Sequence, residues 1–226
     1  MENGSGTDSD GEIYNYWIRW FLNAKGNEYF CEIDEEYILD RFNLTGLQSQ
    51  VPFYQQAIEL MTDELDENNY SEEQFNEFFS SAKHLYGLIH ARFIITARGI
   101  MKMVEKYKRC DFGRCPRVYC NQHPLLPIGV TDEVGEMPVR LYCCKCEDIY
   151  IPKSSKHNTI DGAYFGASFP HMLLQMYPAI KTQISEPMQR YVPKIFGFKV
   201  HKIANLHRWQ DKQRELMNIR INEPTS

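Results

Sequence analysis

The chain has 226 residues and a hydrophobic content of 43%, which allow one large domain or two small ones and exclude wholesale disorder. No stretch reaches the roughly 18–20 apolar residues that cross a bilayer, and residues 1–12 are acidic and polar, unlike a secretory signal, so we expect an intracellular protein. The net charge of −5 hides an asymmetry, because residues 1–80 hold 18 Asp and Glu against 3 Lys and Arg, and the remainder is basic.

The first part of the chain is predicted to be helical. Apolar residues at helical spacing predict a helix around Trp17, Trp20 and Phe21. A second helix is expected from Asp34, which can cap it, to Phe42. A third is expected to follow Pro52, whose position suits a first-turn proline.

The clearest predicted helix begins at Ser71, which has Gln74 three residues later, the pattern of a capping box. Phe, Tyr and Met residues then continue one face at helical spacing as far as Tyr107. Gly99 is expected to mark a break between two helices. An aromatic stripe of this kind is typical of a packed core, and we assign it to the core rather than to a cofactor site.

Short segments rich in turn residues follow the helical region. Residues 114–130 and 139–151 are punctuated by Pro and Gly and rich in β-branched and aromatic residues, so they are predicted to form hairpins. A short helix is expected at 169–176, and a turn or short hairpin at 191–201. Residues 202–221 have the spacing of a weak amphipathic helix.

Four cysteines form two pairs, Cys115-x4-Cys120 and Cys143-x2-Cys146, with 22 residues between the pairs. Zinc takes four soft ligands at tetrahedral corners, and two knuckles of this spacing supply two thiolates each. Because cysteines fill all four positions, no corner is left for a water molecule. The pattern therefore predicts a structural zinc site rather than zinc catalysis, with buried free thiols as the alternative.

The three remaining cysteines have less defined roles. Cys144 competes with Cys143 for the second knuckle, but Cys143 gives the two-residue spacing that suits the metal. Cys110 could pair with Cys115, although it lies where a helix is expected to end. Cys31 lies among apolar residues and is expected in the core.

The triplet Asp-Phe-Gly at 111–113 matches the magnesium-binding motif of protein kinases. The other kinase motifs are absent, and the glycine-containing stretch 162–166 lacks the lysine of a phosphate-binding loop. The seven histidines form no metal-binding HExxH pair. We therefore predict no catalytic residues and no enzymatic activity.

The cysteines belong to longer strings that extend from about residue 13 to 201. They include WIRWF, GNEYFCEID, LYGLIHARFI, CPRVYCNQHPLLPIG, VRLYCCKC, DGAYFG and VPKIFGFKVH. These strings resemble the regulatory beta subunit of casein kinase II. The resemblance implies a non-catalytic subunit that dimerises through a structural four-cysteine zinc lobe. Two catalytic alpha subunits would dock on the dimer to give an alpha2-beta2 tetramer, and their stability and substrate choice would be modulated.

Pattern and resemblance together predict an α+β fold, with an N-terminal all-helical lobe, a zinc-ribbon-like β lobe and an extended C-terminal segment. The expected boundaries are a flexible acidic tail at 1–12, the helical lobe at 13–110, the zinc-binding lobe that dimerises at 111–168, the kinase-docking segment at 169–201 and a C-terminal tail at 202–226. We expect the protein in the cytoplasm and nucleus.

The resemblance also implies roles for particular residues. The ligands of one zinc ion per chain would be Cys115, Cys120, Cys143 and Cys146. Phe196 and Phe198, on either side of Gly197, would be aromatic anchors that enter a groove on the catalytic subunit. The residues around these anchors would be Ile195, Val200, His201 and Met172.

The acidic N-terminus fits the same resemblance. Ser5, Thr7 and Ser9 each have an acidic residue three positions later, the pattern that casein kinase II favours. We expect these three residues to be phosphorylated by the holoenzyme that contains the chain.

The chain departs from the family pattern at four places, one of which is the tail after His201. Cys144 stands where Pro is usual, and Phe196 stands where Tyr is usual. The acidic loop is thinner than in the family and consists of Asp63, Glu64, Asp66 and Glu67.

Two other interpretations stay open. The chain could be a zinc-ribbon module that binds nucleic acid or acts in transcription, but its basic residues in the ribbon are few: Arg114, Arg117, Arg140 and Lys145. It could also be a beta-like paralogue that has lost kinase binding. We expect no membrane partner and no nucleic-acid partner.

Overall fold

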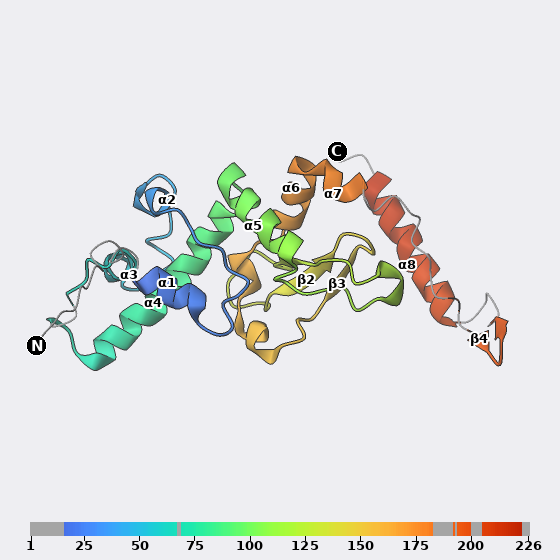
Figure 1. The fold of residues 1–226 in the computed structure, drawn as a ribbon, viewed down its shortest axis with the longest axis horizontal. Helices are drawn as coiled ribbons and strands as arrows, with labels where there is room; N and C mark the ends of the chain where they lie inside the picture. The colour runs from blue at the N-terminus through green and yellow to red at the C-terminus, as the bar shows by residue number, and fades with distance from the viewer. Residues whose placement is uncertain (1–15, 67–68, 183–191, 193, 200–204, 223–226) are drawn as a thin grey trace, which may run out of the picture. The chain divides into compact units, whose positions relative to one another are not determined.

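The structure is a computed structural model, and it describes residues 16–66, 69–182, 192, 194–199 and 205–222. These residues belong to two compact units that divide between residues 186 and 187 (Figure 1). Both helices and small antiparallel sheets are present, which confirms the predicted α+β class. No helix within the described ranges is long and apolar enough to cross a membrane.

Helices form the N-terminal part of the first unit (Figure 1). Their bounds are α1 Tyr16–Asn23, α2 Glu35–Leu39, α3 Tyr54–Met61, α4 Glu72–Phe93 and α5 Ala97–Arg109. The predicted capping box is confirmed: the hydroxyl of Ser71 accepts from the N–H of Gln74 at 3.3 Å, and the Gln74 side chain accepts from the Ser71 N–H at 3.0 Å. This cap fixes the start of the long helix α4, against which α3 packs.

The predicted core stripe is confirmed along most of α4 and α5, whereas Phe75 and Phe79, also predicted as members, are only half-buried. Its buried members are Phe78, Ala82, Tyr86, Ile89, Phe93, Ile100, Met103, Val104 and Tyr107. The ring of Tyr86 lies 4.9 Å from that of Phe21 on α1, which is itself stacked on Trp17. The predicted N-terminal helix is therefore present, and its aromatic face packs on α4.

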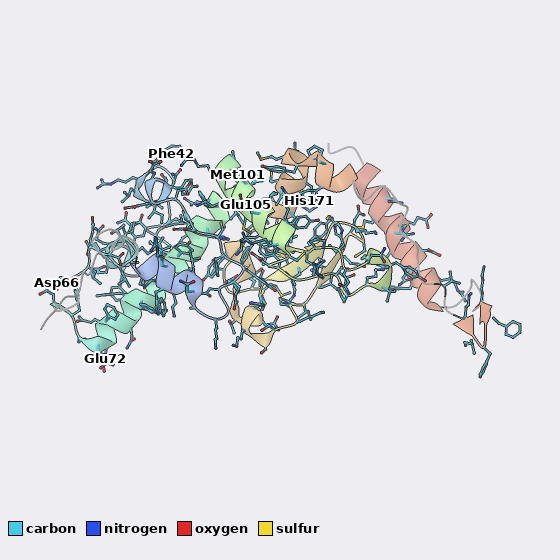
Figure 2. All side chains as sticks on the ribbon, in the orientation of Figure 1. Phe42, Asp66, Glu72, Met101, Glu105 and His171 are labelled. Carbon is cyan, nitrogen blue, oxygen red and sulfur yellow. The ribbon has the colours of Figure 1, made fainter. Side chains whose placement is uncertain are left out.

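Three predicted helix boundaries were wrong. Pro52 lies outside α3, because the N-cap is Phe53 in the left-handed conformation (φ 49°). The second helix ends at Leu39, and Phe42 lies in the turn that follows with its ring exposed (Figure 2). The break between α4 and α5 falls at residues 94–96.

Gly99 has a packing role instead of breaking the helix. It lies in the first turn of α5, where its N–H donates to the hydroxyl of the N-cap Thr96 at 3.1 Å. A Cβ at this position would collide with the carbonyl oxygen of Phe93 at the end of α4. The glycine therefore allows the first turn of α5 to approach the last turn of α4 closely.

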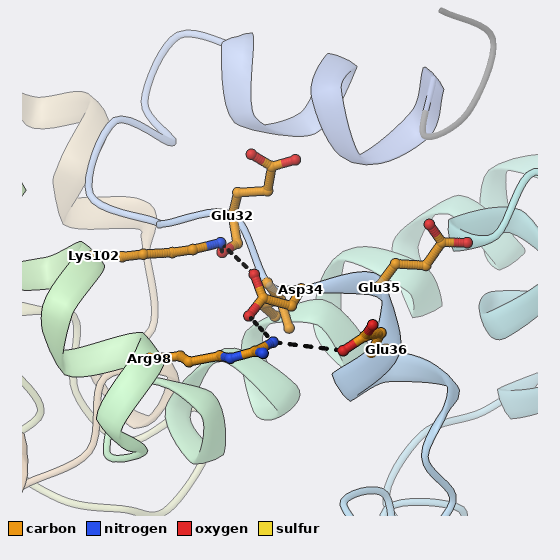
Figure 3. A pocket seen from close by; sticks show the side chains of 7 residues that line it. Glu32, Asp34, Glu35, Glu36, Arg98 and Lys102 are labelled. Carbon is orange, nitrogen blue, oxygen red and sulfur yellow. Dashed lines mark hydrogen bonds and ion pairs between the residues drawn. The ribbon is translucent and has the colours of Figure 1, made fainter.

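The carboxylate of Asp34 links α2 to α5 (Figure 3). It accepts from Lys102 at 2.6 Å and from Arg98 at 3.3 Å, and Arg98 also lies 3.5 Å from the carboxylate of Glu36. The hydrogen bond from Lys102 holds the pKa of Asp34 below its ordinary value, although burial opposes the shift. Asp34 occupies the predicted N-cap position but makes no capping hydrogen bond, because its side chain binds α5.

His90 is fully buried and joins three segments of the first unit. Its Nε2 accepts from the N–H of Cys31 at 3.1 Å, and its Nδ1 lies 2.8 Å from the carbonyl oxygen of Tyr164. Since a carbonyl oxygen can only accept, Nδ1 carries the proton and the imidazole is neutral. Burial lowers the pKa of His90 to about 4.

We expect acid to destabilise the fold through His90, and a His90→Gln variant to lose less stability. Above pH 6.5 the imidazole is neutral in both the folded and unfolded chains. As the pH falls from 6.5 towards 4, the unfolded chain binds the proton first. The difference in unfolding free energy between wild type and variant should therefore change by about 3 kcal/mol. Urea unfolding of both proteins between pH 4 and pH 7.5 measures this difference. Unfolding free energies that change with pH in the same way for wild type and variant would contradict the prediction.

A three-stranded antiparallel sheet follows the helices. Its strands are β1 Leu126–Ile128, β2 Arg140–Cys143 and β3 Asp148–Tyr150, in the order β1-β2-β3. Strands β2 and β3 form the hairpin predicted at 139–151, with Leu141 opposite Tyr150. The hairpin predicted at 114–130 is present only as a bridge between Arg114 and Pro124, because β1 pairs with β2 instead.

Short helices complete the first unit. The 3-10 helices are η2 Val118–Cys120, η3 Ser155–Thr159 and η4 Gly162–Tyr164, and the α-helices are α6 Phe169–Met176 and α7 Pro178–Thr182. Helix α6 confirms the prediction at 169–176 and packs against β1, and η4 packs against α4. The N–H of Gly162 donates to the carbonyl of Met137, and that of Gly129 to the carbonyl of Gly166, so the η4 segment contacts the residues that flank β1 and β2 as well as α4.

The second unit contains a hairpin and a helix. Strands β4 Lys194–Ile195 and β5 Phe198–Lys199 are antiparallel, and α8 spans Asn205–Asn222. Both turn residues, Phe196 and Gly197, have positive φ (48° and 86°), as in the type I′ turns typical of two-residue hairpins. The hairpin and helix predicted for this region are confirmed.

Candidate metal centre and docking hairpin

The structure brings the four predicted cysteines together. The sulfur atoms of Cys115, Cys120, Cys143 and Cys146 all lie within 4.8 Å of one another, and all four residues are buried. In a tetrahedral site with Zn–S bonds of about 2.3 Å, neighbouring sulfurs lie about 3.8 Å apart. The sulfurs of Cys115 and Cys146 are 3.9 Å apart, so the donor set has the size of a zinc site.

Tight turns position both pairs. In the first, the N–H of Cys115 donates to the carbonyl of His123 at 2.8 Å, and Cys120 ends the short helix η2. In the second, Cys143 ends β2, and its carbonyl accepts from the N–H of Glu147, a residue with φ 56°, at 2.7 Å. Each pair therefore lies on a knuckle whose chain reverses just past the cysteines.

Burial and hydrogen bonds shift the pKa values of the cluster in opposite directions. Burial raises the pKa of Cys120 to about 12 and that of Cys143 further. Burial acts in the same direction on Cys146, but hydrogen bonds outweigh it and lower its pKa, first among them the one with the Tyr150 hydroxyl at 3.1 Å. Four thiolates in this space need a compensating charge, which a divalent cation supplies.

Cys144 faces away from the cluster. Its sulfur lies 3.1 Å from Nε2 of His123 and 3.5 Å from the hydroxyl of Tyr107. The structure thus groups Cys143, and not Cys144, with the other three sulfurs. The contact with His123 was missed because it joins the second knuckle to the residues after the first, a packing that cysteine spacing does not encode.

The two other cysteines also lie outside the cluster. Cys110 is the C-cap of α5, in the left-handed conformation, and its sulfur approaches the carbonyl of Lys108 at 3.9 Å. Cys31 is buried, as expected of a core residue.

The kinase-like triplet has a structural role. Asp111 follows α5 and accepts from Arg109 at 2.8 Å, and Phe112 is buried with its ring 5.7 Å from that of Tyr29. Both side chains are therefore engaged in holding the chain between α5 and the first knuckle.

The hairpin of the second unit presents apolar side chains to solvent. Phe196 is 97% exposed, Phe198 79% and Ile195 62%. Met172 belongs to α6 in the first unit and is partly exposed. Val200 and His201 lie outside the described residues.

The structure describes part of the acidic loop. Asp63 has φ 56°, and its carboxylate accepts from the N–H of Trp17 at 3.2 Å, so it ties the end of α3 to α1. Glu64 and Asp66 are described, whereas Glu67 and the expected phosphorylation sites Ser5, Thr7 and Ser9 lie outside the described residues.

The chain matches one protein family along most of its length. The family model for the casein kinase II regulatory subunit matches residues 16–199. The chain is 53% identical over 215 residues to the casein kinase II subunit beta of Schizosaccharomyces pombe, which covers 95% of the chain and 92% of that relative. It is 52% identical over 215 residues to the casein kinase II subunit beta-2 of Neurospora crassa (95% and 74% covered) and 49% identical over 199 residues to the casein kinase II subunit beta' of Drosophila melanogaster (88% of both). The matched range includes both cysteine pairs and the exposed hairpin.

Proposed function

The chain belongs to the family of casein kinase II regulatory subunits, and from this premise we propose that it is a scaffold on which two kinase subunits are mounted. As a regulatory subunit it is not itself a catalyst. The proposed assembly is a dimer of this chain that binds two catalytic alpha subunits and modulates their stability and substrate choice.

The exposed hairpin is the observation that carries the docking proposal. Two aromatic rings on a tight turn are the kind of anchor that fills a pocket on a partner, and their exposure in the free chain favours this role. The proposed contact residues are Ile195, Phe196, Phe198, Val200, His201 and Met172. The test is co-purification of the chain with a casein kinase II catalytic alpha subunit. A chain that dimerises but does not retain the kinase would be a paralogue without this function.

The cysteine cluster is proposed to hold one structural zinc ion per chain. The metal would link the two knuckles and contribute directly to the stability of the lobe. The size of the cluster, its burial and its all-sulfur donor set support this assignment.

The lobe around the cluster is proposed to form the contact with a second copy of the chain. Four exposed apolar side chains support this proposal. Val118 and Tyr119 lie on the first knuckle, Ile149 lies on β3, and Ile151 directly follows β3. A metal-fixed lobe would keep this surface in one shape, so that zinc binding and dimerisation would be coupled. We also propose a location in the cytoplasm and nucleus.

We expect the N-terminus to carry phosphate when the chain is produced together with the catalytic subunit. Ser5, Thr7 and Ser9 each precede an acidic residue at the third position, which suits an acid-directed kinase held in the same complex. Mass spectrometry of the co-expressed complex, with a catalytically inactive alpha subunit as control, measures the modification. An N-terminus without phosphate in the active complex would contradict the proposal.

A further inference from the structure

A cavity of about 360 Å³ opens beside the sheet of the first unit. Its apolar wall is formed by Phe112, Leu125 and Leu141, all nearly completely buried, and none of the four clustered cysteines lines it. The volume lies within the range of roughly 300–1,000 Å³ that small-molecule sites occupy. Neither the metal centre nor the docking hairpin accounts for this cavity, and of the side chains proposed for the contact between two copies Ile151 alone lines it.

Tyr29 gives the cavity an unpartnered polar group. The residue is only 3% exposed, and its ring is held by stacking on His157 at 4.0 Å and by the edge contact with Phe112. Among the described residues its hydroxyl makes no hydrogen bond to another protein group, and it is not among the fully buried polar atoms, so it is open to solvent from the cavity. A donor fixed in a wall of the cavity is thus left available for a ligand.

The charged residues of the lining leave an excess of positive charge. Arg114 and Lys153 line the cavity, and neither forms an ion pair within the part of the chain that the structure describes. The carboxylate of the lining, Asp111, is already paired with Arg109 at 2.8 Å and Lys106 at 3.6 Å. An anion entering the cavity would therefore meet two uncompensated cations and little opposing charge.

We propose that this cavity binds a small amphipathic anion, made of an aromatic or branched apolar body with a carboxylate or phosphate group. The apolar body lies against Phe112, Leu125 and Leu141, and the anionic group lies near Arg114 and Lys153. The Tyr29 hydroxyl supplies a further hydrogen bond. This binding activity is separate from kinase docking and metal binding, so it can be tested whether or not those proposals hold.

The test uses two probes of the same shape, 2-naphthoate and the neutral 2-naphthalenemethanol, titrated against the full-length chain and followed by naphthyl fluorescence anisotropy. We expect naphthoate to bind once per chain, and more tightly than the alcohol. Replacing both Arg114 and Lys153 with Gln should weaken naphthoate about tenfold and leave the alcohol unchanged, because only the carboxylate meets these cations. The matched control is Lys156→Gln, an exposed lysine on η3 that does not line the cavity and should change neither affinity.

A blocking variant locates the binding. Ser154 lines the cavity, is half-buried and makes no side-chain hydrogen bond in the described structure, so Ser154→Trp should fill the space and abolish binding of both probes. A thermal melt like that of the wild type shows that this variant is folded. The proposal is overturned if naphthoate binds the folded Ser154→Trp chain with unchanged affinity. It is also overturned if naphthoate binds the wild-type chain no more tightly than the alcohol does.

Discussion

Replacing Phe196 and Phe198 together with Ala is expected to abolish binding of the catalytic alpha subunit and to leave the dimer of this chain intact. Both rings lie in the second unit, away from the cysteine cluster in sequence, and both are almost fully exposed in the free chain. Truncating an aromatic anchor at an interface typically costs about 2–4 kcal/mol. Losing both should therefore weaken the complex by about 1,000-fold or more.

The measurement is co-purification of each variant with the alpha subunit, with the affinity from surface plasmon resonance and the dimer from analytical ultracentrifugation. Phe42→Ala is a matched control, because that ring is also exposed but lies in the turn after α2. It should bind the kinase like the wild type. Unchanged co-purification of the double variant would contradict the docking proposal.

A second variant separates loss of the rings from loss of the turn. Phe196 has φ 48° and precedes Gly197, the two positions of a type I′ turn, for which Asn-Gly is the preferred pair. Phe196→Asn therefore keeps or improves the hairpin while it removes one anchor. We expect kinase binding to weaken in this variant, whereas Phe196→Tyr, which keeps the ring, should bind normally.

Features set by neighbouring residues could be predicted from the sequence. The capping box needs only Ser71 and Gln74, and the exposed hairpin needs only a glycine between short β-prone segments. The two cysteine knuckles are likewise local, because each sulfur pair lies within one turn of chain. Their coming together follows from the chemistry of the four sulfurs rather than from the helical or strand pattern.

Features set by distant contacts could not be predicted in this way. Gly99 is a glycine because the first turn of α5 lies against the carbonyl of Phe93, and Asp34 turns away from its own helix to bind Lys102. Strand β1 pairs with β2 rather than with the residues before it. The cavity beside Tyr29 likewise joins segments more than eighty residues apart, which no local pattern encodes.

Replacing Cys143 with Ser is expected to release zinc, unfold the lobe around the cluster and abolish the dimer. Serine keeps the size of the side chain but offers a hydroxyl in place of a soft thiolate, and the three remaining sulfurs hold the metal far less tightly. Apparent binding free energies of structural zinc reach about 10–16 kcal/mol, so losing most of this free energy is comparable to the whole stability of an ordinary domain, about 5–15 kcal/mol. Elemental mass spectrometry measures the zinc content per chain. The thermal unfolding midpoint reports the stability, and the sedimentation coefficient reports the dimer.

Cys144→Ser is the control that makes this result specific. The two cysteines are adjacent and both buried, but the sulfur of Cys144 meets His123 and Tyr107 instead of the cluster. This variant should keep one zinc per chain and the dimer, with at most a modest loss of stability from the changed contact. If Cys144→Ser released the metal and Cys143→Ser retained it, the knuckle would use the other cysteine. If Cys143→Ser stayed dimeric without zinc, the metal would not be needed for the contact between the two copies. This result would contradict the proposed coupling of zinc binding to dimerisation.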